Sequence, residues 1–129
     1  GVIPPQSVNE EFLTTLDLFP MVTSLASVSL PDGHILDGHN VLPVLAGHER
    51  SPRQEMFWQR RDHSAARVGN WKWIRLGDQE YLFDLSTDIG EQTNLAKSHP
   101  AQLTKLRAAF ATWEATMQAA EPRGPFRDY

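Results

Sequence analysis

Trp58, Arg60, Arg61, Asp62 and His63 are the residues whose types and spacing point most directly to chemistry. A guanidinium group can bind an oxoanion through two parallel hydrogen bonds, and an indole ring can stack on a sugar. We therefore predict that Arg60, Arg61 and His63 form a binding site for an anionic group on a carbohydrate. The alternative is an ordinary charged loop with Trp58 in the core.

The charge along the chain favours an anionic ligand at this place. The 129 residues carry a net charge of −4, but the segment 50–75 holds seven basic and two acidic residues, so it carries +5 and the remainder −9. A basic patch concentrates anions near it. The alternative is a solvated surface whose arginines pair with nearby carboxylates.

Composition excludes several classes of protein. The chain is acidic overall and has no RNA- or DNA-binding motif, so we predict no nucleic-acid partner. Its apolar runs are far shorter than the roughly 18 residues of a membrane span. There is no cysteine and hence no disulfide scaffold, while a hydrophobic content of 40% allows a modest core.

Metal-binding and catalytic patterns are weak. His34 and His39 lie in a glycine-containing connector, but their spacing is not that of a metal-ligand pair on a helix. Asp84, Asp88 and Glu91 do not fit a calcium loop, and we expect Asp88 to fix a turn through backbone hydrogen bonds. No nucleophile, base and orienting residue can be recognised together. The sequence therefore predicts no catalytic residue, metal or cofactor site within this chain.

The elements that must position the candidate residues are short strands. Aromatic and β-branched residues recur in four runs, joined by the turn dipeptides Gly69-Asn70 and Gly77-Asp78 and by a loop over 60–64. We predict an antiparallel sheet from these runs, which span 55–59, 65–68, 71–76 and 81–85. Trp71 and Trp73 should share one face of it.

Two helices complete the expected fold. After Pro100, apolar residues recur at three- and four-residue steps on one face, which should cover the sheet. This stripe comprises Leu103, Leu106, Phe110, Trp113 and Met117. Residues 16–27 predict an earlier helix with an apolar face, residues 8–13 an edge strand, and residues 41–47 a short helix or turn that ends at Gly47. The predicted class is α+β, with a tail over 121–129.

Five segments together resemble the closing subdomain of the type I sulfatases. Residues 65–74 are similar to the family pattern VR-x-G-x-WK, residues 81–85 to LYDL and residues 88–96 to D-P-x-E-x-x-NLA. Residues 17–20 and 37–47 are similar to D-L-x-P-T and DG-x-x-L-x-P-L-L-x-G. Met21 and Ile89 depart from these patterns, standing where the family usually has Thr and Pro.

The resemblance implies a fold and an activity. The fold would be the carboxyl-terminal subdomain of an alkaline-phosphatase-like sulfatase, with residues 1–47 closing the catalytic domain and 48–129 forming the subdomain. The parent enzyme would hydrolyse sulfate esters on a glycan or an aryl sulfate, using formylglycine and a divalent metal, usually calcium. Because no [Cys/Ser]-x-Pro-x-Arg motif occurs here, the chain would be a non-catalytic segment that borders the cleft.

Other interpretations stay open. The chain could be a non-catalytic glycan- or protein-binding module, or the end of a related phosphatase or phosphonate hydrolase. Its expected partners are the catalytic domain of the same polypeptide, a sulfated substrate and, for the isolated chain, a second copy. A typical bacterial parent would be periplasmic or secreted.

Overall fold

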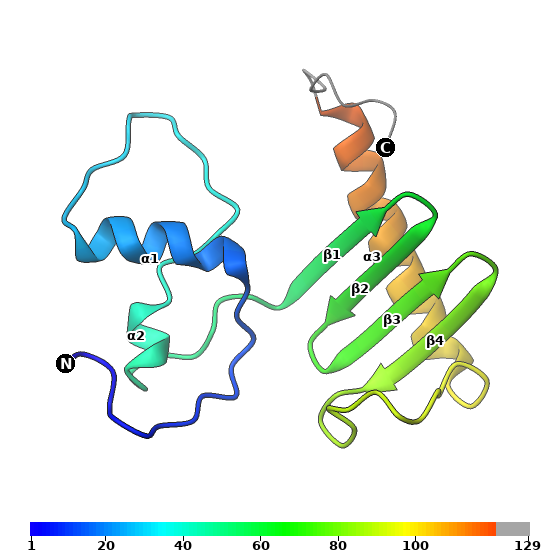
Figure 1. Ribbon diagram of the computed structural model, residues 1–129. Helices are drawn as coiled ribbons and strands as arrows, with labels where there is room; N and C mark the ends of the chain where they lie inside the picture. The colour runs from blue at the N-terminus through cyan, green and yellow to red at the C-terminus, as the bar shows by residue number, and fades with distance from the viewer. Residues whose placement is uncertain (121–129) are drawn as a thin grey trace. The chain divides into compact units, whose positions relative to one another are not determined.

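The computed structural model describes residues 1–120, so the predicted tail over 121–129 lies outside the described part. The chain forms two compact units, residues 1–54 and a second that begins at Glu55, and each is described by itself (Figure 1). The assignment of residues 1–47 to a catalytic domain stays a prediction. No helix within residues 1–120 is long and apolar enough to cross a membrane.

A four-stranded antiparallel sheet forms the second unit, with the strands in chain order (Figure 1). The strands are β1 (Glu55–Arg60), β2 (His63–Val68), β3 (Trp71–Leu76) and β4 (Gln79–Asp84). Arg60 pairs with His63, so the expected loop over 60–64 is wrong. The connection is a two-residue turn, because both strands extend further than their aromatic residues indicated.

Helix α3 (Pro100–Ala119) covers one face of this sheet, as its apolar stripe predicted. One side chain from each strand faces it in a single cross-strand row, Phe57, Ala66, Trp73 and Leu82. Leu103, Leu106 and Phe110 from α3 complete the buried core. Trp71 also packs against this core, which confirms that it shares a face with Trp73. The α+β class is thereby confirmed.

The segment after β4 seals the outer edge of that strand. Asn94 accepts a hydrogen bond from Leu82 N at 3.0 Å and donates to Glu80 O at 3.0 Å, and Leu95 N donates to Leu82 O at 2.7 Å. Asp88 accepts from Gln92 N and Thr93 N, at 3.0 and 2.8 Å. The structural role predicted for Asp88 is confirmed.

The first unit contains the 3₁₀ helix η1 (Thr15–Asp17), helix α1 (Leu18–Leu25) and the short helix α2 (Leu42–Leu45). The expected helices are confirmed, with α2 ending before Gly47. Residues 8–13 form no strand, so that prediction is wrong. Side chains hold this segment instead, because Ser51 Oγ donates to Phe12 O at 2.6 Å. The apolar face of α1 is exposed, with Phe19 at 53% and Val22 at 55%.

Gly38 marks a close approach between the connector and η1. A β-carbon at position 38 would lie 2.0 Å from the carbonyl oxygen of Leu16, far inside van der Waals contact. Gly38→Ala should therefore lower the free energy of unfolding of the first unit by about 1–3 kcal/mol, since backbone must shift. Chemical denaturation followed by far-ultraviolet circular dichroism measures this.

Gly90→Ala is the matched control for that experiment. Its β-carbon would meet only the Gln92 and Asp88 side chains, with the nearest atom at 3.6 Å, so stability should stay equal or rise slightly. Equal denaturation midpoints for Gly38→Ala and Gly90→Ala would show that the connector accommodates the added methyl group without loss of stability.

Candidate functional site

The candidate site is the tip of the β1–β2 hairpin. Arg60 ends β1 and His63 begins β2, so the register places them side by side on one face of the sheet. Arg61 occupies the turn with a φ of 56°, a left-handed conformation that is uncommon for a residue with a side chain. All three side chains are exposed. A tightly paired hairpin thus holds three basic groups at its tip.

These groups have few internal partners. His63 Nε2 lies 3.7 Å from Asp62 Oδ1, and both side chains are exposed, at 55% and 72%. Within residues 1–120, no ion pair or side-chain hydrogen bond involves Arg60 or Arg61. Their guanidinium groups are therefore available to an external anion.

Other basic residues of the segment 50–75 are engaged within the fold. Arg67 Nε donates to Gly69 O at 3.0 Å, and burial lowers the pKa of Arg67. Lys72 Nζ lies 2.5 Å from Glu91 Oε1. Arg75 donates to Ser64 Oγ at 2.9 Å and lies over the Trp73 ring. Among residues 1–120, Arg60 and Arg61 differ from these structural cations because they form no ion pair or side-chain hydrogen bond.

Trp58 lies on the sheet face opposite α3, with 42% of its surface exposed. The alternative that placed it in the core is wrong, because β1 alternates and the adjacent Phe57 takes the core position. A shallow groove on this unit is lined in part by Trp58, Arg60, His63 and Ile74. An exposed aromatic ring and two basic residues therefore border one hollow.

The most deeply buried ion pair among residues 1–120 lies in the first unit and was not recognised from the sequence. Arg53 Nη2 lies 2.5 Å from Asp17 Oδ1, with the side chains 7% and 2% exposed. Asp17 also accepts from His39 N at 2.9 Å and Thr14 N at 2.7 Å. Burial alone would raise the pKa of Asp17, but these hydrogen bonds outweigh it and lower the pKa to about 2. Thr14 and Asp17 have the spacing of a helix-capping box, but no sequence pattern relates either residue to Arg53.

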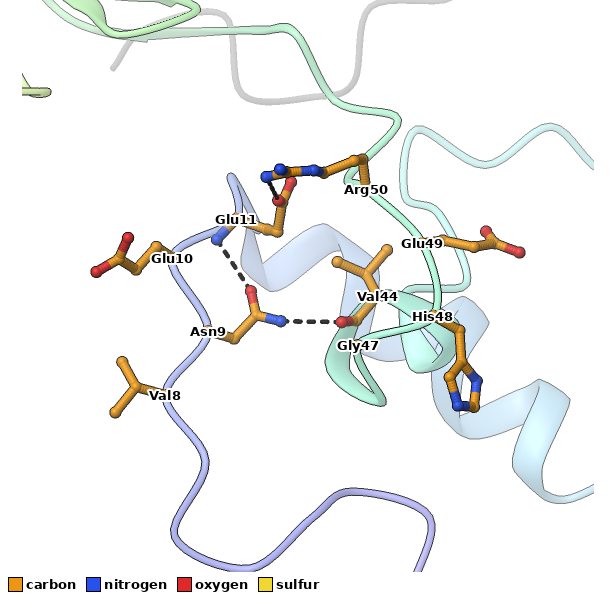
Figure 2. A pocket seen from close by; sticks show the side chains of 9 residues that line it. All are labelled: Val8, Asn9, Glu10, Glu11, Val44, Gly47, His48, Glu49 and Arg50. Carbon is orange, nitrogen blue, oxygen red and sulfur yellow. Dashed lines mark hydrogen bonds and ion pairs between the residues drawn. The ribbon is translucent and has the colours of Figure 1, made fainter.

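A second hollow lies in the first unit, between residues 8–11 and 47–50 (Figure 2). Asn9 bridges its walls, because its Nδ2 donates to Val44 O at 2.9 Å and its Oδ1 accepts from Glu11 N at 2.9 Å. Arg50 Nη1 lies 2.7 Å from Glu11 Oε1. Its central polar groups therefore bind one another and hold the amino-terminal segment in place.

Neither hollow has the ligand set of a metal centre. Within the part of the chain that the structure describes, no three His, Cys, Asp or Glu side chains gather closely enough to hold a metal ion. What the arrangement offers chemically is an anion-binding tip on a hairpin, beside an exposed aromatic ring.

No protein-family model matches the chain, but curated proteins do. It is 34% identical to an uncharacterized sulfatase of Schizosaccharomyces pombe, over 88% of this chain and 23% of that protein. It is 30% identical to human arylsulfatase A, over 97% of this chain and 31% of the enzyme. It is 28% identical to an N-acetylgalactosamine-6-O-sulfatase of Bacteroides thetaiotaomicron, over 75% of this chain and 22% of the enzyme. The chain thus spans about a quarter of the length of these relatives.

Solved structures share the fold. A 2-O glycosaminoglycan sulfatase superposes with a TM-score of 0.68 and 24% identity, over 92% of this chain and 29% of that one. Ps i-CgsB, solved in complex with k-i-k-neocarrahexaose, superposes with a TM-score of 0.64 and 27% identity. The match covers 80% of this chain and 24% of that one. A phosphonate monoester hydrolase from Silicibacter pomeroyi superposes with a TM-score of 0.60 and 22% identity. The match covers 92% of this chain and 28% of that one. From the sequence matches and the shared fold together, the chain belongs to the sulfatase family and corresponds to the carboxyl-terminal portion of its members.

Proposed function

We propose that the chain is the closing segment of an enzyme that hydrolyses sulfate esters on a glycan, and that its own role is structural and cleft-bordering. Three relatives that align with this chain are named sulfatases, and the name of one specifies N-acetylgalactosamine 6-O-sulfate. Ps i-CgsB was solved in complex with an oligosaccharide, which supports a sugar substrate here. The nucleophile and any metal would come from the remainder of the enzyme, since the sequence has no formylglycine motif.

The observation that carries the proposed role is the set of basic groups at the hairpin tip. Arg60 and Arg61 have no internal ion-pair partner among residues 1–120, and the two-residue turn fixes their backbone. Groups held on a rigid scaffold are suited to binding. We assign Arg60, Arg61 and His63 to a sulfate or sugar group other than the one that is cleaved.

A contact of that kind acts on binding rather than on chemistry. The anion away from the reacting bond keeps its charge from the ground state to the transition state, so Arg61 should stabilise both equally. Its loss should then raise KM and leave kcat nearly unchanged. A charge-assisted contact at an exposed site contributes about 1.4 kcal/mol, which corresponds to roughly a tenfold change.

The test is Arg61→Ala in the intact parent enzyme, assayed on a sulfated oligosaccharide and on a small aryl sulfate. KM should rise about tenfold on the oligosaccharide alone, because the aryl sulfate carries no second anion. Arg61→Asn is tested in parallel, because asparagine tolerates the left-handed backbone at position 61. Comparing the two variants separates the effect of losing the charge from the effect of backbone strain. If Arg61→Ala leaves KM and kcat unchanged on both substrates, the hairpin tip is a solvated turn that does not bind substrate.

Lys105→Ala is the control for a general loss of positive charge, because Lys105 is exposed on α3. It should leave KM unchanged on both substrates. A phosphonate monoester belongs in the same assay, since a hydrolase of that class shares the fold. Preferred turnover of the phosphonate would replace the sulfatase proposal with that alternative.

A further inference from the structure

The two edges of the sheet differ in a way that the sulfatase role does not explain. The outer edge of β4 is closed by Asn94 and Leu95, which bond to Glu80 and Leu82. Within residues 55–120, no segment forms a backbone hydrogen bond to the outer edge of β1. An edge left open presents unpaired N–H and C=O groups to another strand. Within residues 55–120, the outer backbone groups of β1 are therefore left for a further strand to pair with.

The geometry of β1 determines which residues face outward. In a two-residue hairpin the residues that flank the turn exchange hydrogen bonds, so Arg60, Trp58 and Met56 direct their backbone groups toward β2. Glu55, Phe57 and Gln59 then direct theirs outward. Strand β1 contains no proline or bulge that would protect the edge, and α3 packs mainly over β2 and β3.

The side chains of β1 are complementary to a second copy of themselves. Glu55 begins the strand, Arg60 ends it, and Arg61 follows in the turn. An antiparallel pair of two such strands brings the acidic end of each copy to the basic end of the other. A register that pairs Phe57 with Gln59 also sets Trp58 opposite Trp58 at the two-fold axis. Aromatic pairs opposite one another stabilise sheets.

We propose that two copies of this chain associate through β1, forming a continuous eight-stranded antiparallel sheet with Trp58 against Trp58 and Glu55 beside Arg61. An isologous contact of this kind closes after two copies, so it gives a dimer rather than a fibre. The dimer does not require a sulfated ligand, although pairing and the proposed anion site share Arg61. In the paired state Glu55 of the second copy occupies the place of the anion at Arg61, so a sulfated ligand should compete with pairing.

The register can be tested by disulfide trapping, because the chain contains no cysteine. Trp58→Cys places two thiols opposite each other at a non-hydrogen-bonded pair, where the α-carbons lie about 4.5 Å apart and a disulfide can form. Under mild oxidation it should give a covalent dimer. Met56→Cys and Arg60→Cys pair with each other in this register, so neither alone should cross-link to a comparable extent. Equal cross-linking of all three would overturn the register.

Sedimentation velocity tests the surface itself. Wild type should dimerise with rising concentration, and Gln59→Pro, which removes an outward N–H donor, should raise the dimer dissociation constant at least about tenfold. Glu55→Lys and Arg61→Glu should each weaken the dimer, and the double variant should restore it. Phe19→Glu on the exposed face of α1 should have no effect. A monomer at every concentration, or a dimer broken only by Phe19→Glu, would overturn the proposal.

Discussion

Replacing Arg53 with alanine should lower the free energy of unfolding of the first unit by about 3–5 kcal/mol. The guanidinium and the Asp17 carboxylate are buried, with Arg53 Nη2 2.5 Å from Asp17 Oδ1. The variant leaves Asp17 as a buried charge that has lost its cationic partner. Asp17 also holds Thr14 N and His39 N, so its displacement should loosen the start of η1 and the connector together.

Hydrogen exchange at the amides of Thr14 and His39 measures this locally. Such a readout is needed because all four tryptophans lie in the second unit, so their fluorescence does not report on residues 1–54. Arg50→Ala is the matched control, since Arg50 also pairs with a carboxylate but is 92% exposed. It should cost less than about 1 kcal/mol. Similar exchange rates in the two variants would contradict the assigned role of Arg53.

The same pair predicts an acid transition. The folded state holds the pKa of Asp17 at about 2, below its usual value of 3.8. As the pH falls, the carboxyl group of Asp17 is therefore protonated in the unfolded state before it is protonated in the folded state. The stabilisation that ionised Asp17 gives to the fold is complete above about pH 4 and is lost as the pH falls toward 2. The loss amounts to about 2 kcal/mol. Asp17→Asn should flatten this dependence when exchange protection at His39 is compared at about pH 5 and about pH 2.5.

Phe110→Ala should cost the second unit about 3–5 kcal/mol, as truncation of a fully buried aromatic residue does. Phe110 is 3% exposed and lies 5.3 Å from Trp73, 5.4 Å from Trp113 and 6.5 Å from Phe57, measured between ring centroids. The cavity would open at the centre of the contact between α3 and the sheet. Urea denaturation followed by tryptophan fluorescence measures the change.

Two further variants in α3 make the comparison specific. Trp113→Ala should cost less than Phe110→Ala, because Trp113 is only half-buried and stacks on Phe57 at 5.5 Å. Lys105→Ala, on the exposed side of the helix, should change stability by less than about 0.5 kcal/mol. A larger loss from Trp113→Ala than from Phe110→Ala would show that the carboxyl-terminal end of α3 carries the contact.

The elements of this protein follow from local sequence. Alternating aromatic residues predicted β3 and β4, and the apolar residues three and four apart predicted α3, because each pattern repeats with the period of its own backbone. The turns at Gly69 and Gly77 were also predicted from local sequence. Both residues have a positive φ, which glycine adopts readily. The family resemblance also rested on short contiguous motifs, and the sulfatase relatives confirm it.

The tertiary structure alone decided which distant groups meet. Asp17 and Arg53 are 36 positions apart, and no periodicity relates them. The hairpin turn proved shorter than predicted. In the observed register Trp58 faces outward and Phe57 stacks on Trp113. The open edge of β1 likewise depends on which strands found partners. Local patterns fix the conformation of a segment, whereas pairing between distant segments depends on register and packing. A one-residue shift in the register of β1 would exchange the side chains on its two faces.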